Sequence, residues 1–412
     1  MIDTRSVRTL LITRDMPYPP SGGSPLRTWQ SINIMMKFGS VGVFSVFNWN
    51  PNRKSLPGVA LWNHCNVAGQ LSTWEKLEHR AWWLRPNGQR DIDGAYTNAA
   101  AGELDKVLAE WKPQLVVFEE LWVYRYLPLV KRYGCPIIFN THNVEARLFE
   151  DISRSFEDLK SKVRANIELF HIKSIERDFI RQVNQVWTCS DEDAHLLNDM
   201  YGQTPHTYVV PNGINVASYE EVRLGKYTPA SGLDETSRTL LFVGSFPYVP
   251  NRQAAELLIN QIYPQLREVY PDCRLLLVGR KPTQRMQELA KREPGIIITG
   301  GVPDVRPYLA AASAVVIPLL QGGGTRLKIL EAFAAGRPVV STAKGAEGLR
   351  VRDGEHLLIR NDVEGLVAGV CQLWSNPSLG EKLAHSAYEL VQAEYSWEAV
   401  GRRVEPAVQK LL

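Results

Sequence analysis

The sequence has little cysteine and no long apolar run. Its 412 residues include 5 cysteines, which lie far apart and form no CxxC pair. We therefore expect no disulfide framework and no zinc site, but reduced thiols in a cytoplasmic protein. No run of about 18 apolar residues occurs, and the apolar segment 9–13 is too short for a signal peptide, so neither a membrane-spanning helix nor secretion is expected.

An excess of charge of one sign is also absent. The chain has 47 Lys and Arg against 44 Asp and Glu, which gives a net charge of +3. A dedicated nucleic-acid-binding protein normally needs a clear basic excess for its phosphate contacts, so no nucleic-acid partner is expected. A nucleotide ligand stays compatible with this balance, because a helix N-terminus and a few placed cations are enough to bind it.

Short apolar, β-branched runs alternate with amphipathic stretches along the whole chain. The predicted strands are 9–13, 41–47, 115–119, 136–140, 185–189, 207–211, 239–243, 273–278, 296–299, 313–317, 337–341 and 356–359. Continuous apolar strands joined by helices indicate parallel sheets that are covered on both faces. Because twelve strands in one open sheet would be unusual, we expect an α/β protein of two doubly wound, Rossmann-like domains.

The predicted domain boundary lies where the pattern becomes polar and rich in turn residues. We expect an N-terminal domain over 1–211, a linker over 212–238 and a C-terminal domain over 239–390. A last helix is predicted over 391–412, for which packing back against the first domain is one option. Residues 48–98 are the least regular part and are interpreted as an excursion between two strands of the first sheet.

The strongest motif is the segment 321–332, QGGGTRLKILEA, which leads from a strand into a helix. Its three glycines let a ligand approach the backbone, and the N–H groups at the helix N-terminus form an anion site. Arg326 and Lys328 place cations in the first turn, where the helix dipole disfavours them, and this suggests an anionic ligand. Glu331 shares a helix face with Leu327, and its carboxylate can accept hydrogen bonds from both hydroxyls of a ribose. A tight turn before a solvated helix is the alternative interpretation.

Four motifs occur in an order that is typical of one enzyme family. They are GGGTRLKILEAFAAGRPVVST with GAEGL at 345–349, FVGS at 242–245, LVGR at 277–280 and MPYPPSGG at 16–23. In this order the chain resembles the retaining glycosyltransferase family four, of the GT-B fold. The likeness covers most of the chain, is closest over 239–350, and is greatest to the branch associated with bacterial exopolysaccharide and cell-surface glycan synthesis.

The resemblance implies that a sugar moves from a nucleotide-diphosphosugar, UDP- or GDP-linked, to an acceptor hydroxyl. It implies a hexosyltransferase-type reaction with retention at the anomeric carbon, without a metal and without a cofactor. The C-terminal domain would bind the donor, and the N-terminal domain would bind a glycan, lipid-linked or small-molecule acceptor. By this resemblance Glu331 binds the donor ribose. The other donor-binding candidates are Gly22, Gly23, Gly244, Ser245, Asn251, Arg280, Gly323, Gly324, Thr325 and Leu327.

Two departures from the family pattern concern the donor. Gly323 stands where the family usually carries a glutamate that contacts the donor sugar, so other groups must bind the sugar hydroxyls. The two phosphate-binding cations after the first strand of the C-terminal domain are replaced by Ser245 and Asn251. Arg326 and Lys328 are the candidates for the missing charge and are assigned to catalysis for this reason. The reserve candidates are Arg252 and Arg280.

Polar motifs also follow two strands of the first domain. Glu119-Glu120 and His142-Asn143 stand at strand ends, where open parallel sheets bind their ligands, so these groups are expected to converge. By the resemblance, His142 is the active-site histidine and hydrogen-bonds the transferred sugar or the acceptor without acting as a base. Paired carboxylates, as in glycosidases, are not required, since the leaving phosphate can take the proton. The acceptor-side candidates are Arg27, Glu120 and Asn143.

Other functions remain open. A sugar-nucleotide epimerase of the same architecture is one, and a non-catalytic nucleotide-sugar-binding protein is another, because Gly323 removes a sugar contact. The tryptophan- and arginine-rich stretch 74–90 favours a hydrophobic cap on the first sheet. Peripheral contact with the inner face of the membrane, through Trp82 and Trp83, is the alternative.

Overall fold

The computed structural model describes residues 7–20, 23–47, 55–67, 71–85, 87–154, 156, 158–202, 204–233, 238–322 and 326–412. The contacts divide the chain into two compact units, of which the first comprises Met1–Asn212 and Val400–Leu412 and the second Gly213–Ala399. The five cysteines are all free thiols. None of the helices in the described ranges has the length and apolarity that a membrane crossing requires.

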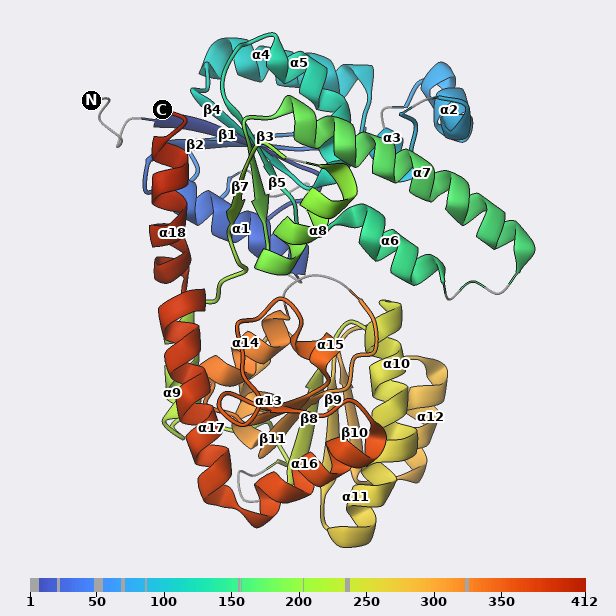
Figure 1. Ribbon diagram of the computed structural model, residues 1–412, viewed down its shortest axis with the longest axis vertical. Helices are drawn as coiled ribbons and strands as arrows, with labels where there is room; N and C mark the ends of the chain where they lie inside the picture. Colours follow the sequence, from blue (N-terminus) through green and yellow to red (C-terminus); the bar gives the residue numbers. More distant parts are fainter. Residues whose placement is uncertain are drawn as a thin grey trace. The chain divides into compact units, whose positions relative to one another are not determined.

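The first unit is built on a seven-stranded sheet in the order β3-β2-β1-β4-β5-β6-β7 (Figure 1). Its strands are β1 (Val7–Thr13), β2 (Gly39–Ser45), β3 (Leu61–His64), β4 (Leu115–Glu119), β5 (Ile137–Asn140), β6 (Gln185–Thr188) and β7 (His206–Val209). All neighbouring strands run parallel. The winding direction reverses between β1 and β4, and open α/β sheets bind ligands outside the strand ends at such a point.

Helices cover both faces of this sheet. The helical segments of this unit are α1 (Gly23–Met35), α2 (Thr73–Arg80), η3 (Trp82–Leu84), α3 (Arg90–Gly94), α4 (Asn98–Trp111), η4 (Leu121–Tyr126), α5 (Leu127–Lys131), α6 (Glu145–Ser153), α7 (Leu159–Gln182) and α8 (Asp191–Tyr201). Alternate strand residues such as Leu10 and Phe118 pack against α4, α5 and α7 in one apolar core, while Figure 1 shows α1 on the other side of the sheet.

The second unit contains a six-stranded parallel sheet in the order β10-β9-β8-β11-β12-β13. Its strands are β8 (Thr239–Val243), β9 (Arg274–Val278), β10 (Ile296–Gly300), β11 (Ala314–Ile317), β12 (Val339–Ser341) and β13 (Leu358–Ile359). Its helical segments are η5 (Val216–Tyr219), α9 (Glu220–Arg223), α10 (Val249–Leu257), η6 (Leu258–Ile262), α11 (Tyr263–Val269), α12 (Gln284–Arg292), α13 (Arg306–Ala311), α14 (Leu327–Ala334), α15 (Ala343–Ala346), α16 (Val363–Ser375), α17 (Pro377–Leu390) and η7 (Val391–Tyr395). One apolar core joins these elements.

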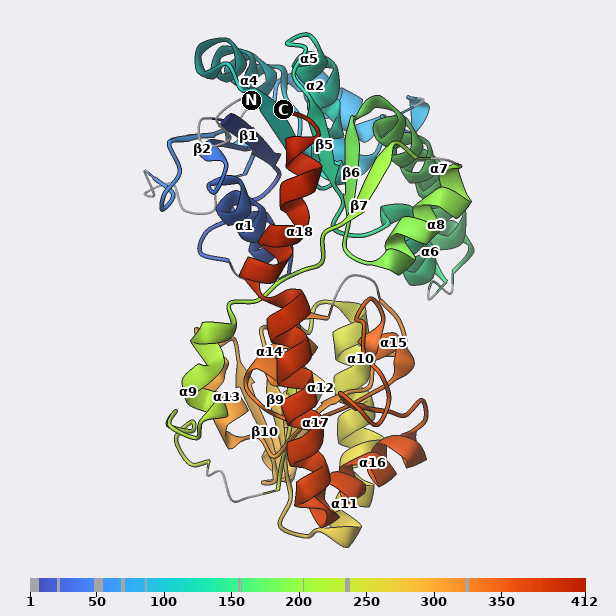
Figure 2. The ribbon, with the colours of Figure 1, turned by 60° about the vertical axis from the view of Figure 1, so that its left-hand side comes forward.

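The last helix, α18 (Trp397–Gln409), crosses the boundary between the units. Its residues from Val400 onward belong to the first unit, so the chain passes between the units twice (Figure 2). The buried Gln185 side chain of β6 donates to the Ala407 carbonyl at 2.7 Å. Lys410 lies 5.6 Å from the Tyr208 ring, next to β7.

The predicted fold class is confirmed, since both units are parallel-sheet α/β structures. Each of the twelve predicted strands is present, with ends that differ by at most two residues. The sequence did not predict β3, which lies in the irregular excursion. This strand, LWNH, is half-exposed and pairs with β2 alone, so it lacks the continuous apolar run that marks a buried strand.

Candidate functional site

The glycine-rich segment of the second unit connects β11 to α14. Gly322 adopts a positive φ of 109°, and a Cβ there would lie 2.8 Å from the Tyr248 hydroxyl, so only glycine fits. The predicted site residues Gly323, Gly324 and Thr325 lie outside the described residues. α14 begins at Leu327, which is half-buried, and its C-terminal turn ends at Gly336 with a φ of 65°.

Lys328, in the first turn of α14, has no described carboxylate to balance its positive charge. Its Nζ donates to Asn251 Oδ1 at 2.7 Å and lies 4.3 Å from the Phe242 ring centre. Within the described ranges, no carboxylate lies within ion-pair distance of this amino group. Burial, followed by repulsion from Arg326, lowers the pKa of Lys328 to about 7, against the attraction of Glu331. A group in this situation gains from the arrival of an anion.

Glu331 lies three residues further along the same helix. Its Oε1 accepts a hydrogen bond from the Tyr219 hydroxyl at 3.1 Å. Burial raises the pKa of Glu331 to about 7, while Tyr219 and Lys328 act in the opposite direction. No described side chain donates to its Oε2, so this oxygen remains able to accept from a ligand. Tyr219, at the end of η5, had no recognisable signal in the sequence.

Asn251, in α10, holds Lys328 in place through its side-chain amide. Its Nδ2 donates to the Ser245 carbonyl at 3.0 Å, which leaves Oδ1 to receive Lys328. A Cβ on Gly244 would lie 2.9 Å from Asn251 Cγ, so the glycine makes room for this amide. The structure therefore brings Gly244, Ser245, Asn251 and Lys328 together.

The other predicted donor-side cations differ from Lys328. Arg326 is buried, and its guanidinium donates to the Gly322 carbonyl at 2.7 Å and the Lys344 carbonyl at 3.3 Å. This geometry favours a role in shaping the glycine-rich segment over direct contact with phosphate. Arg280 is exposed and Arg252 half-buried, and neither forms an ion pair with a described residue.

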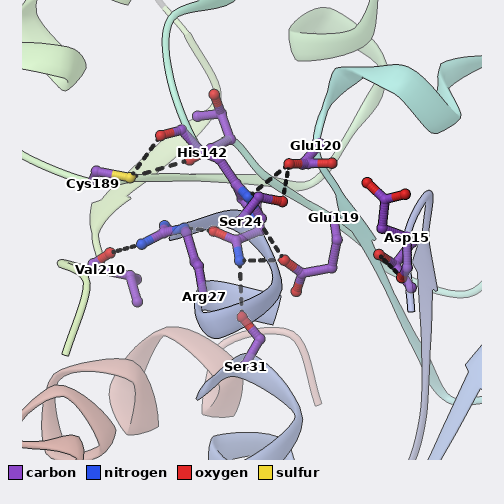
Figure 3. A network of polar contacts seen from close by, with 12 residues as sticks. Asp15, Ser24, Arg27, Ser31, Glu119, Glu120, His142, Cys189 and Val210 are labelled. Atoms are coloured by element: carbon purple, nitrogen blue, oxygen red, sulfur yellow. Dashed lines mark hydrogen bonds and ion pairs between the residues drawn. The ribbon is translucent and has the colours of Figure 1, made fainter. Parts of the chain in front are cut away.

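In the first unit, His142 is held between two carboxylates (Figure 3). Its Nε2 lies 2.9 Å from Glu119 Oε2 and its Nδ1 lies 3.1 Å from Glu120 Oε1. An ionised carboxylate only accepts hydrogen bonds, so Nε2 donates to Glu119, whereas the Nδ1 contact with Glu120 is a close ionic approach without hydrogen-bond alignment. Burial lowers the pKa of His142, but the Glu120 charge and the contacts with both glutamates outweigh it and raise the pKa above its ordinary value.

Glu120 is held in an uncommon backbone conformation. Its φ is 72°, a region that costs free energy for any residue other than glycine and that recurs at functional sites. Ser24, in the first turn of α1, donates to Glu120 Oε1. Burial raises the pKa of Glu120, but His142 and Ser24 outweigh it, so the net shift is downward. Gly23 is the exposed first residue of α1, and Gly22 lies outside the described residues.

Arg27 and Asn140 form the base of this network. The buried Arg27 guanidinium donates to the carbonyl of Val210 at 2.7 Å and to side-chain oxygens of Asn212 at 3.0 Å and Asn140 at 2.6 Å. Asn140 in turn donates to Glu119 Oε2 at 2.9 Å. Arg27 therefore joins α1 to the ends of β5 and β7, which is a structural task and differs from the predicted contact with a ligand.

A second carboxylate pair lies beside His142 and was not predicted. Asn143 donates to Glu145 Oε1 at 3.2 Å, and the Glu145 backbone N–H donates to Glu176 Oε1 at 2.8 Å. Burial, together with the Glu120 and Glu176 charges, raises the pKa of Glu145 to about 8. Isolated glutamates in amphipathic stretches normally indicate solvent-exposed positions, so the sequence carried no signal for this pair.

Comparison with known proteins identifies both units. The family models described as "Glycosyltransferase Family 4" and "Glycosyl transferases group 1" match residues 77–218 and 237–376. A phosphatidyl-myo-inositol mannosyltransferase of Mycobacterium leprae is 30% identical over 203 residues, which cover 47% of this chain and 51% of that protein. The chain thus spans about half the length of the curated relatives it matches first.

Solved structures resemble the whole chain. Sucrose-phosphate synthase from Thermosynechococcus elongatus has a TM-score of 0.74 at 16% identity and covers 98% of this chain and 99% of its own. Anabaena HepE in complex with UDP and glucose has a TM-score of 0.66 at 12% identity, with the same coverage. At these identities the likeness concerns the fold. With two parallel α/β units and family matches in both halves, the chain belongs to glycosyltransferase family four, of the GT-B fold.

Proposed function

We propose that this protein is a retaining, metal-independent glycosyltransferase that moves a hexose from a nucleotide-diphosphosugar to an acceptor hydroxyl. The observation that carries the proposal is Lys328, a half-buried cation in the first turn of α14 whose only described hydrogen-bond partner is the neutral amide of Asn251. Glu331 stands one turn further along the helix with an oxygen available to a ribose. Together the two side chains match the two ends of a nucleoside diphosphate.

The donor would bind through three kinds of contact in the second unit. The diphosphate takes the Lys328 ammonium and the positive end of the helix dipole at the start of α14. The ribose hydroxyls donate to Glu331, whose orientation Tyr219 fixes through its hydrogen bond. Gly322 and Gly244 leave room for the side chains of Tyr248 and Asn251, which a Cβ at either position would meet.

Transfer would follow the front-face course that the family resemblance implies. The bond from the anomeric carbon to the phosphate oxygen breaks as the acceptor oxygen forms its bond on the same face. The acceptor proton passes to the departing diphosphate, so the sugar keeps its configuration and no protein base is consumed. Lys328 and the helix N-terminus stabilise the negative charge of the leaving group, which is where such catalysis gains most.

His142 fits this course as a hydrogen-bond donor. Its raised pKa favours the imidazolium form, which has no lone pair to take a proton from the acceptor. Glu119 orients the ring through its hydrogen bond with Nε2, so the Nδ1–H, which lacks an aligned partner among the described residues, would donate to a sugar hydroxyl. Such a preorganised donor supplies stabilisation without reorganisation during the reaction.

The names of the relatives narrow the substrates that deserve testing. One relative is named a phosphatidyl-myo-inositol mannosyltransferase, and HepE was solved with UDP and glucose. We propose a hexose donor linked to UDP or GDP and an acceptor of the cell-surface glycan type, either lipid-linked or oligosaccharide. Activity in the cytoplasm, where reduced thiols persist, agrees with the five free cysteines.

A panel of nucleoside diphosphates and their sugars tests the proposal. One nucleoside diphosphate is expected to raise the melting temperature of the full chain more than its nucleoside does. The matching sugar nucleotide should then release the diphosphate faster when acceptor glycans are present, with the product anomer read by NMR. Binding without turnover over a broad set of acceptors would instead support a nucleotide-sugar-binding protein, and an inverted product would contradict retention.

A further inference from the structure

The first unit exposes an apolar stripe on α7 that no other described element covers. Leu159, Val163, Ile167 and Phe170 are 76%, 52%, 43% and 69% exposed. At about 100° per residue these four side chains fall within roughly 80° of the helix circumference. A long helix of an isolated soluble unit normally turns such a stripe toward the core.

The opposite face of α7 already packs against the core of the first unit. Ile172, Ile175 and Phe179 are buried in the core of the first unit. The helical positions of these residues lie about half a turn away from the exposed stripe. α7 therefore carries two apolar faces, and only one of them is needed for folding.

The stripe continues onto the segment that follows α2. Trp83, in η3, is 54% exposed and lines a hollow of about 650 Å³ together with Leu159, Val163 and Ile167. We call Trp83 and the four α7 residues the η3–α7 surface. Trp82, which was considered for the same contact, is instead buried, and its ring meets His171 edge-on at 5.6 Å. Trp82 lines the same hollow but exposes little surface, so Trp83 is the tryptophan that the hollow presents to a partner.

Basic side chains flank this surface. Lys160 and Lys162 follow the first residue of the stripe on its two sides, and Arg80 and Arg164 line the hollow beside Lys160. Among the described residues, Lys160, Lys162 and Arg164 form no ion pair, and the hollow has no acidic residue in its described lining. The nearest carboxylate in sequence, Asp158, caps α7 by accepting from the Ser161 backbone N–H at 2.8 Å.

We propose that the η3–α7 surface docks onto an anionic lipid bilayer. A helix with an apolar stripe, basic flanks and aromatic side chains lies in the interface with its apolar face among the acyl chains. The lysines and arginines then meet the negative leaflet, and Trp83 and Phe170 sit at headgroup depth. This assignment goes beyond the proposed reaction, because none of the donor or acceptor residues belongs to the surface.

Vesicle sedimentation with the full chain tests the docking. The protein should sediment with vesicles of phosphatidylcholine and phosphatidylglycerol, and about tenfold less with phosphatidylcholine alone or in high salt. The variant Leu159→Ser/Val163→Ser/Phe170→Ser should lose about tenfold or more of this binding. The matched control Leu224→Ser/Val269→Ser/Leu320→Ser changes apolar residues of the second unit that are 47%, 59% and 64% exposed, and it should bind as the wild type does.

The charge is tested separately. Lys160→Gln/Lys162→Gln/Arg164→Gln should reduce binding to the level seen with phosphatidylcholine alone, whereas Arg285→Gln/Lys291→Gln/Arg292→Gln on α12 should not. Nucleoside-diphosphate affinity should be unchanged in all four variants. Vesicle binding thus tests the docking, and diphosphate affinity tests the proposed function separately. Absence of wild-type binding, or equal loss in a control, would overturn the proposal. So would a concentration-dependent dimer that the α7 variant abolishes, since the occupant would then be a second copy.

Discussion

The charged clusters of the two units are balanced in opposite ways. In the second unit, the Lys328 ammonium rests on a neutral amide, and Glu331 is held by one tyrosine hydroxyl. In the first unit, the His142 cation is enclosed by two carboxylates that other side chains also hold. A cation without a counter-ion attracts an anionic ligand. A cation that is already paired with carboxylates carries little net charge, so it is better suited to orient a neutral ligand. The difference agrees with a donor diphosphate on one side and a hydroxyl acceptor on the other.

The largest effect on stability and turnover is expected from removing the His142 ring from between Glu119 and Glu120. His142→Ala leaves Glu119 and Glu120 buried without their cation, and we expect a loss of about 3 kcal/mol in the free energy of unfolding. Turnover should fall by about 100-fold or more, since one preorganised donor is lost. Urea denaturation and steady-state rates measure the two effects. His142→Gln, which retains one donor, should lie between the wild type and the alanine variant, and unchanged diphosphate affinity in both would separate the two clusters.

Removing the Lys328 charge should weaken ligand binding without lowering the stability of the fold. Lys328→Met is expected to weaken nucleoside-diphosphate binding by about 100-fold, near 3 kcal/mol, and to leave nucleoside binding almost unchanged. The unliganded protein should be at least as stable as the wild type, because a half-buried charge without a counter-ion is gone. Calorimetry measures both affinities, with Arg280→Met as the control for an exposed cation. Equal losses for nucleoside and diphosphate would mean that Lys328 does not bind phosphate.

Glu331→Ala separates the ribose from the phosphate. The ribose hydroxyls lose an ionised acceptor, so nucleoside and diphosphate should both bind about 30-fold more weakly, near 2 kcal/mol. A 2′,3′-dideoxy nucleotide should be insensitive to the substitution, because it has no hydroxyl to donate. If the dideoxy ligand loses as much affinity as the natural one, the carboxylate has another role.

The pH dependence of donor binding follows from the same two side chains. Lys328 must carry its proton to bind the diphosphate, so affinity should fall as pH rises above its pKa of about 7, by about tenfold per unit at most. Glu331 must be ionised to accept from ribose, so affinity should also fall below about pH 7. Titration calorimetry across this range should give a maximum near neutrality. In Lys328→Met the decline on the alkaline side should disappear.

The smallest effect is expected at Tyr219 of the second unit. Tyr219→Phe removes the hydrogen bond to Glu331 Oε1 and should weaken nucleotide binding by about fivefold, near 1 kcal/mol. Tyr227→Phe, which loses a comparable hydrogen bond to Asp304, serves as the matched control. A larger loss in the control would show that general loosening of this unit explains the effect.

The parts of the molecule that depend on local sequence pattern could be predicted from the sequence. Buried parallel strands are continuous apolar runs, so all but β3 could be predicted, and that strand fails because it is half-exposed. Lys328 and Glu331 stood out because they share one helix with the glycines. Tyr219 did not, because 112 residues separate it from Glu331 and only the fold joins them. Glu145 and Glu176 were missed for the same reason, as their burial results from the packing of α6 against α7.

The return of α18 to the first unit has a consequence for how the protein is made. The Gln185 side chain, buried in β6, finds its acceptor in Ala407, 222 residues later in the chain. During synthesis the first sheet therefore emerges long before the residues that complete it, and it must wait while the entire second unit is made. A fragment ending at Asn212 would leave that amide without its partner, so the first unit cannot be obtained intact by cutting the chain once.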